Sequence, residues 1–227
     1  MRVKTITWLS PQDAPERFPP LERALDEPPG LLAAGGDLSP ERLLAAYERG
    51  IFPWYSPGQP VLWWSPDPRA VLFPREFHCT RSLAKTLRNA GIETAIDRDF
   101  AAVIAGCAAP RESSLGTWIT PEMRAAYLEL HRHGHAHSFE TYRDAALVGG
   151  LYGVRLGDVF FGESMFSRER DASKVALARL VEFALAESIV VIDCQLPSPH
   201  LQSLGSRSIP RSQFQTLLRE HVPHSRK

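Results

Sequence analysis

The sequence has few cysteines, no long apolar run and no net charge. Its three cysteines, Cys79, Cys107 and Cys194, are odd in number and form no CxxC pair, which argues against a disulfide framework and a structural zinc site. No apolar stretch is long enough to cross a membrane, and the N-terminal residues lack the apolar core of a signal peptide. We therefore expect a cytoplasmic protein that does not bind membranes. Because 26 basic residues balance 26 acidic ones, any nucleic-acid contact has to come from a local patch.

Common nucleotide-binding and hydrolase motifs are also missing. No GxxxxGK[ST] phosphate loop, no GxGxxG dinucleotide fingerprint and no GxSxG nucleophile occurs. The alternating His131, His133, His135 and His137 cross a predicted boundary between a helix and a strand, so they have no fixed two-histidine geometry and we expect no metal there. Carboxylate, amide, hydroxyl and arginine groups remain. These groups suit transfer from an already activated donor, where the protein supplies alignment, a proton path and oxyanion stabilisation.

The composition changes near residue 69, which predicts two domains. Residues 1–69 hold most of the 19 prolines and four of the five tryptophans, and we expect a small loop-rich domain with one helix from Pro40 to just before Gly50. Its aromatic residues could form a core, or a platform for a base or an apolar side chain. Residues 70–227 alternate between strand and helix patterns, which predicts an α/β (α+β) catalytic domain.

A strand–helix–strand pattern contains the most informative polar residues. The apolar runs Phe160–Phe166 and Ile189–Leu196 are separated by the helix-length segment Ala172–Glu187, which predicts a parallel strand pair. Asp193 and Gln195 are two residues apart and are expected to share a strand face, next to the strand that carries Glu163. Carboxylates in apolar strands are rare unless paired or catalytic, so this cluster is a structural charge pair or a site. We interpret it as the site.

Two basic groups are candidates for contacts with RNA phosphates. One lies at i, i+4 and i+7 on the predicted helix from Thr80 to Asn89: Arg81, Lys85 and Arg88. This stripe is either a solvated helix face or a phosphate contact. The other group flanks the start of the Ala172–Glu187 helix, where a helix N-terminus favours an anion: Arg168, Arg170 and Lys174.

Distinctive short blocks occur through nearly the whole chain. They are Gly35–Ser39, Gly50–Trp54, Trp63–Arg69, Gly116–Ile119, Leu147–Gly153, Gly162–Ser167, Ala172–Lys174, Ile192–Gln195, His200–Leu201 and Ser203–Gly205. Together they resemble the leucyl/phenylalanyl-tRNA–protein transferase family. The resemblance implies a bacterial enzyme that moves leucine or phenylalanine from the 3′ acceptor end of aminoacyl-tRNA to proteins or peptides with N-terminal arginine or lysine. The sequence leaves open whether methionine is also a donor. It also implies that the product is marked for degradation. No cofactor is expected, because an aminoacyl ester is already activated.

The resemblance further implies a fold and roles for individual residues. A small N-terminal domain (1–69) would lie beside an acetyltransferase-like (GNAT-like) mixed-sheet domain (70–227), and we expect a monomer. Asp193 and Gln195 would be the catalytic pair, and Glu163 a carboxylate that binds substrate. On chemical grounds we assign Asp193 as the base or electrostatic anchor and Gln195 as the group that orients the attacking amine. The expected substrate-binding residues are Trp54, Trp118, Ser164, Met165, Leu180 and Ile192.

Three other functions remain open. A coenzyme A-dependent N-acyltransferase is one, although the segment after the Phe160–Phe166 strand, from Arg168 to Ser173, has no glycine for a phosphate cradle. A cell-wall-type peptide aminoacyltransferase would use the same donor class. A non-catalytic module that binds the tRNA end would tolerate loss of Asp193, whereas a transferase would not.

Overall fold

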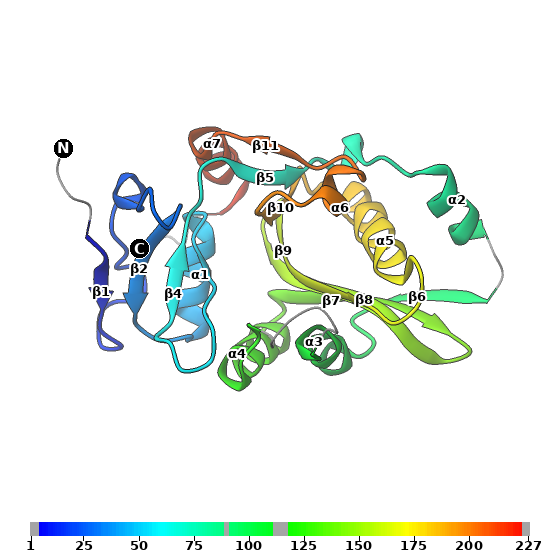
Figure 1. Ribbon diagram of the computed structural model, residues 1–227, viewed down its shortest axis with the longest axis horizontal. Helices are drawn as coiled ribbons and strands as arrows, with labels where there is room; N and C mark the ends of the chain where they lie inside the picture. Colours follow the sequence, from blue (N-terminus) through cyan, green and yellow to red (C-terminus); the bar gives the residue numbers. More distant parts are fainter. Residues whose placement is uncertain (1–4, 89–90, 111–117, 224–227) are drawn as a thin grey trace.

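The computed structural model describes residues 5–88, 91–110 and 118–223, which form two sheets and the helices around them (Figure 1). Gly116 and Thr117 of the block quoted above lie outside the described residues. The small sheet has the order β1-β2-β4-β3: β1 (Thr7–Leu9), β2 (Leu31–Gly35), β3 (Phe52–Pro53) and β4 (Leu62–Trp64). The large sheet has the order β11-β5-β10-β9-β8-β7-β6: β5 (Arg69–Leu72), β6 (Ile92–Ile96), β7 (Ala136–Arg143), β8 (Ala146–Leu156), β9 (Val159–Ser167), β10 (Val191–Gln195) and β11 (Arg207–Ile209).

The helices pack on both faces of the large sheet and beside the small one. They are α1 (Pro40–Glu48), α2 (Arg81–Arg88), α3 (Phe100–Ala108), α4 (Pro121–Arg132), α5 (Ala172–Ala186), α6 (Pro199–Gln202) and α7 (Arg211–His221), with 3-10 turns at Leu21–Arg23 and Pro74–Glu76. Helix α5 covers one face of the large sheet, and α3 and α4 cover the other (Figure 1). No helix in the described residues is both long enough and apolar enough to span a membrane.

The topology confirms the expected α/β class with a mixed sheet. β9 and β10 pair in parallel, as the helix-length crossover predicted, and β8 pairs antiparallel with both β7 and β9. The close approach of α5 to the sheet requires Gly149 on β8, because a Cβ there would lie 2.5 Å from the Cβ of Ala172. The four short strands of the small sheet and β11 were not predicted, since they lie among prolines and glycines that signal turns and loops.

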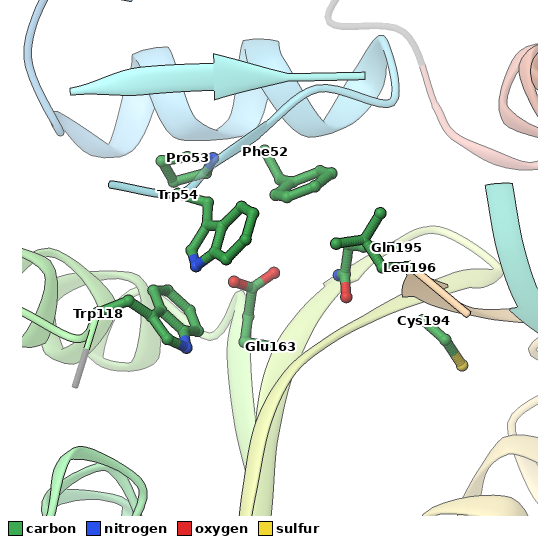
Figure 2. A pocket seen from close by; sticks show the side chains of 8 residues that line it. All are labelled: Phe52, Pro53, Trp54, Trp118, Glu163, Cys194, Gln195 and Leu196. Atoms are coloured by element: carbon green, nitrogen blue, oxygen red, sulfur yellow. The ribbon is translucent and has the colours of Figure 1, made fainter. Parts of the chain in front are cut away.

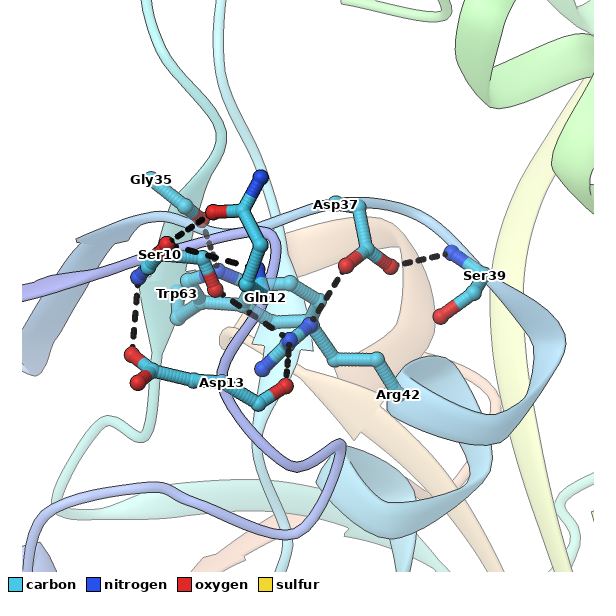
Figure 3. A network of polar contacts seen from close by, with 8 residues as sticks. All are labelled: Ser10, Gln12, Asp13, Gly35, Asp37, Ser39, Arg42 and Trp63. Atoms are coloured by element: carbon cyan, nitrogen blue, oxygen red, sulfur yellow. Dashed lines mark hydrogen bonds and ion pairs between the residues drawn. The ribbon is translucent and has the colours of Figure 1, made fainter.

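The N-terminal segment is fastened to α1 by a buried arginine (Figure 3). The Arg42 guanidinium donates to the Asp37 carboxylate (3.2 Å) and to the backbone carbonyl of Asp13 (2.8 Å). One hydrophobic core continues from the small sheet through α1 to β9, where the rings of Tyr47 and Phe161 lie 4.9 Å apart. The small sheet and α1 therefore share one core with β9, the strand that carries Glu163.

β9 and β10 separate at the predicted site. The two strands pair only where Val159–Phe161 lies beside Val191–Asp193. Beyond it, β9 has an irregular register against β8 between Gly162 and Ser164, and β10 has a bulge between Asp193 and Gln195. The two strand ends diverge, and the opening between them contains Glu163 and Gln195.

Candidate active site

Two cavities meet where β9 and β10 diverge, and both are lined by Glu163, Cys194 and Gln195. One, of about 210 Å³, is aromatic (Figure 2). The other, of about 330 Å³, is mainly apolar and lies between the sheet and α5. The polar groups at the junction can therefore reach a molecule that occupies both cavities at once.

The aromatic cavity brings together the two predicted tryptophans. Trp54 follows β3 and Trp118 precedes α4, and their indoles lie on the same side of Glu163 (Figure 2). The Nε1 of Trp64 donates to the Trp54 carbonyl (2.6 Å) and the two rings lie 5.6 Å apart, which fixes the position of Trp54. Trp54 is still 40% exposed. Accessible aromatic faces of this kind suit a flat ring such as a nucleobase.

The apolar cavity brings together the four residues predicted from β9, α5 and β10. Met165, Leu180 and Ile192 line it, as does Ser164. Leu177, one turn before Leu180, lines it too, because residues three apart share a helix face. The volume is at the lower end of the range for small-molecule sites and suits one apolar amino-acid side chain.

Asp193 is fully buried and ion-paired. Arg69 Nε donates to its Oδ1 and Arg69 Nη2 to its Oδ2, both at 2.7 Å. The backbone N–H of Gln195 donates to the same Oδ1 (3.1 Å). A third guanidinium nitrogen, Nη1 of Arg69, donates to the carbonyl of Gly50 (3.0 Å), just before β3. Both carboxylate oxygens of Asp193 are thus occupied by donors within the protein.

Gln195 reaches the cavity junction through a bulge. Regular alternation, which predicted that Asp193 and Gln195 share a face, stops between them, and Gln195 has a left-handed backbone (φ 55°). This conformation is unfavourable for a residue with a side chain and is stabilised here by the hydrogen bond from its N–H to Asp193. The side-chain Nε2 is buried and makes no hydrogen bond within the described residues. It is a free donor at the junction.

Glu163 has one oxygen occupied and one free. Its Oε2 accepts a hydrogen bond from the hydroxyl of Tyr127 (2.7 Å), and that hydroxyl lies 2.6 Å from the hydroxyl of Tyr47. Its Oε1 is buried and has no hydrogen-bond partner within the described residues. Burial raises the pKa of Glu163 to about 7, against the hydrogen bonds from the tyrosines, which lower it. A carboxyl with this pKa can exchange a proton near neutral pH.

Cys194 lines both cavities but is not suited to act as a nucleophile. Burial raises the pKa of its thiol well above the usual range, so the thiol stays protonated. Two of the alternating histidines have partners within the protein: Nδ1 of His137 lies 2.7 Å from Asp97, and Nδ1 of His131 lies 2.8 Å from the carbonyl of Ala136. The parts of the chain that the structure describes contain no cluster of three metal-ligating side chains.

None of the basic residues predicted to contact RNA lines either cavity. α2, which carries Arg81, Lys85 and Arg88, is at the far end of the molecule from the small sheet (Figure 1). At the start of α5, Lys174 Nζ pairs with Asp171 (2.7 Å) and Arg168 donates to the carbonyl of Leu147 (2.9 Å). Arg170 is almost fully exposed. Their role in binding RNA stays a prediction.

Three functional residues were missed by the sequence interpretation: Arg69, Tyr47 and Tyr127. Arg69 ends the Trp63–Arg69 block and begins the otherwise apolar strand β5, an unusual position for a fully buried cation. Tyr47 and Tyr127 belong to apolar helix stripes, where a tyrosine looks like ordinary core. Only the tertiary structure shows that their hydroxyls form a hydrogen-bonded chain that ends at the Glu163 carboxylate.

The site has the groups that suit the transfer of an apolar acyl group. It combines an apolar cavity, accessible aromatic faces, and a carboxylate and an amide where the two cavities meet. The family model described as leucyl/phenylalanyl-tRNA protein transferase matches residues 71–219, and the model of that family's N-terminal domain matches residues 36–67. The chain belongs to the leucyl/phenylalanyl-tRNA–protein transferase family. Its members transfer an aminoacyl group from tRNA to the N-termini of proteins.

Relatives with high sequence identity agree with this assignment. The leucyl/phenylalanyl-tRNA–protein transferase of Azotobacter vinelandii is 62% identical over 90% of this chain and 91% of its own length. The transferase of Pseudomonas entomophila is 58% identical over 96% of this chain and 95% of its own length. Among solved structures, a GCN5-related N-acetyltransferase from Kribbella flavida has a TM-score of 0.41 at 13% identity, covering 73% of this chain and 59% of that one. L-PGS from Bacillus licheniformis has a TM-score of 0.40 at 10% identity, covering 70% of this chain and 51% of that one.

Proposed function

We propose that this enzyme uses leucyl- and phenylalanyl-tRNA as donors and acts in the cytoplasm, as a monomer, on proteins that begin with arginine or lysine, marking them for degradation. Family membership supports this choice of substrates. The donor's apolar side chain would occupy the cavity lined by Met165, Leu180 and Ile192, and its terminal adenine would lie against Trp54 and Trp118. The ester bond, which joins the aminoacyl group to the ribose of the terminal adenosine, then falls at the cavity junction. Its position there is supported by the fact that Glu163 and Gln195 line both cavities.

In the proposed reaction, Glu163 carries the proton that the attacking amine must lose. The neutral α-amine of the acceptor attacks the ester carbonyl, the new C–N bond forms and the C–O bond to the ribose breaks. Glu163 accepts the amine proton on its free Oε1 and returns it to the leaving ribose oxygen, so protons and electrons balance. Tyr127 stays hydrogen-bonded to Oε2 and stabilises the ionised carboxylate.

Gln195 and Asp193 have different tasks in this proposal. The free Nε2 of Gln195 would donate to the carbonyl oxygen as negative charge develops on it. Asp193 has no free oxygen, because Arg69 and the Gln195 N–H occupy both. Of the two roles considered for Asp193, base and electrostatic anchor, the geometry therefore supports the anchor. It holds Gln195 in position through the hydrogen bond from the Gln195 N–H.

The observation that carries this proposal is the pair of unpartnered buried polar atoms, Glu163 Oε1 and Gln195 Nε2, at the junction of the two cavities. Buried polar atoms without partners are uncommon in folded proteins and indicate where a substrate completes the hydrogen bonding. The test is incubation with radiolabelled leucyl-tRNA and two otherwise identical peptides, one beginning with arginine and one with alanine. We expect label only in the arginine peptide. Equal labelling, or none, would contradict the proposal.

A further inference from the structure

A third cavity, of about 480 Å³, adjoins the aromatic cavity and shares Phe52, Trp54 and Leu196 with it. Most of its other lining residues are prolines: Pro28, Pro29, Pro66, Pro68 and Pro197. Trp64 forms part of the same wall. We call this surface the proline groove. It has no place in the donor arrangement described above, because the donor's side chain and adenine already occupy the other two cavities.

The chemistry of the proline groove suits a polypeptide and not the backbone of RNA. Its lining is mainly apolar and includes no lysine or arginine, whereas binding phosphates requires cations. The one charged residue that lines it is the exposed Asp67, which would repel a phosphate. Arg211 lies close by, but its guanidinium donates to the carbonyl of Ser65 (2.7 Å). Grooves lined by aromatic rings are a known type of site for extended peptides.

The groove is continuous with the proposed reaction centre. Leu196 directly follows Gln195, lines both the aromatic cavity and the groove, and is 42% exposed. An extended chain advances about 3.3 Å per residue, so a peptide whose first residue lies at Gln195 enters the groove with its next residues. We propose that the proline groove binds the second and third residues of the acceptor polypeptide and favours apolar side chains there. This inference rests on the proposed function.

The first test varies the acceptor and needs no mutant. Three peptides that begin with arginine and differ only at positions two and three, carrying Leu-Leu, Gly-Gly or Asp-Asp, are compared as acceptors of leucine. Partial burial of leucine side chains should lower the acceptor KM about tenfold relative to glycine. The Asp-Asp peptide should have the highest KM, because its carboxylates would enter an apolar groove beside Asp67.

The second test varies two residues that line the groove but neither of the other two cavities. Pro29→Ser should reduce the preference for Leu-Leu over Gly-Gly, and Asp67→Lys should lower the KM of the Asp-Asp peptide selectively. Glu182→Lys, the same change of charge on the exposed face of α5, is the matched control and should leave all three KM values unchanged. The KM for leucyl-tRNA should not move in any of these variants.

The outcomes separate this inference from the proposed function. If all three peptides accept leucine with equal KM, the groove assignment is overturned while the proposed function stands. If Pro29→Ser or Asp67→Lys raises the KM for leucyl-tRNA and leaves the peptide preference intact, the groove belongs to the RNA end and the inference is likewise overturned. If no arginine peptide accepts leucine, both fall together.

Discussion

Arg69 and Asp193 form a buried bidentate ion pair with both donor–acceptor distances at 2.7 Å. The guanidinium also stacks against the rings of Phe52 (4.8 Å) and Phe214 (4.9 Å). Through Asp193 it fixes the strained backbone of Gln195, and through the carbonyl of Gly50 it fixes the chain that leads to Trp54. One cation therefore positions two walls of the site.

This ion pair predicts a loss of stability together with a loss of rate. Breaking a buried pair by removing one partner costs about 3–5 kcal/mol, because the other charge is left uncompensated. Asp193→Asn should lower the free energy of unfolding by an amount in this range, measured by urea denaturation. The double variant Arg69→Met/Asp193→Leu should regain much of that stability, since no charge remains buried. It should not regain transfer activity if the pair positions Gln195, whereas recovery of activity would refute that role.

The apolar cavity predicts a donor preference. Burying a leucine-sized side chain contributes about 1.5–3 kcal/mol, enough to favour leucyl- over alanyl-tRNA by about one to two decades in kcat/KM. Isoleucyl- and valyl-tRNA should serve less well, because branching at Cβ places a methyl group at the polar mouth of the cavity instead of among Met165, Leu180 and Ile192. Steady-state comparison of the four charged tRNAs decides this. Equal use of isoleucine and leucine would mean that the cavity does not hold the donor side chain.

The pKa of Glu163 predicts how stability depends on pH. The folded-state value of about 7 lies above the ordinary value of 4.5, so the folded protein retains a proton that the unfolded chain releases between these values. The favourable contribution is complete below pH 4.5 and is lost as the pH rises towards 7. The loss is about 3 kcal/mol at most. Glu163→Gln should remove this slope, which unfolding curves measured from pH 4.5 to 8 will show. An identical slope in the variant would place the titrating group elsewhere.

The tyrosine hydroxyls offer a finer test of the same carboxyl. The hydrogen bond from Tyr127 lowers the pKa of Glu163, so Tyr127→Phe should raise it and move the pH–rate inflection to higher pH. Tyr152→Phe is the matched control, because the Tyr152 hydroxyl is buried nearby without a hydrogen bond in the described residues. That variant should leave the inflection where it is. A shift of equal size in both variants would argue against a specific role for Tyr127.

The basic face of α2 predicts a salt effect on tRNA binding. Each phosphate contact steepens the slope of log affinity against log salt concentration by about 0.7 to 0.9. Replacing Arg81 and Lys85 together with alanine should weaken tRNA binding and flatten that slope, measured by filter binding across salt concentrations. An unchanged slope would show that this helix face is merely solvated.

Sequence patterns predicted the parts of the site that depend on local periodicity. The parallel β9–β10 pair follows from two apolar runs separated by a helix-length segment. The cavity lined by Met165, Leu180 and Ile192 was expected from the family resemblance and not from periodicity. The Arg69–Asp193 pair could not be predicted in this way, because its members are 124 residues apart in the chain. No periodicity signals the bulge before Gln195 either, since an extra residue in a strand leaves both flanking patterns intact.

Single-turnover kinetics of Glu163→Gln test the central claim most directly, namely that this carboxylate carries the amine proton at the cavity junction. The variant is mixed in excess with radiolabelled leucyl-tRNA and an arginine peptide, and acceptor affinity is measured separately by peptide binding. We predict a loss of about two to four decades in the single-turnover rate, typical of removing a positioned acid–base group, with acceptor affinity changed no more than severalfold. An unchanged single-turnover rate with weakened peptide binding would make Glu163 a binding residue and contradict the account.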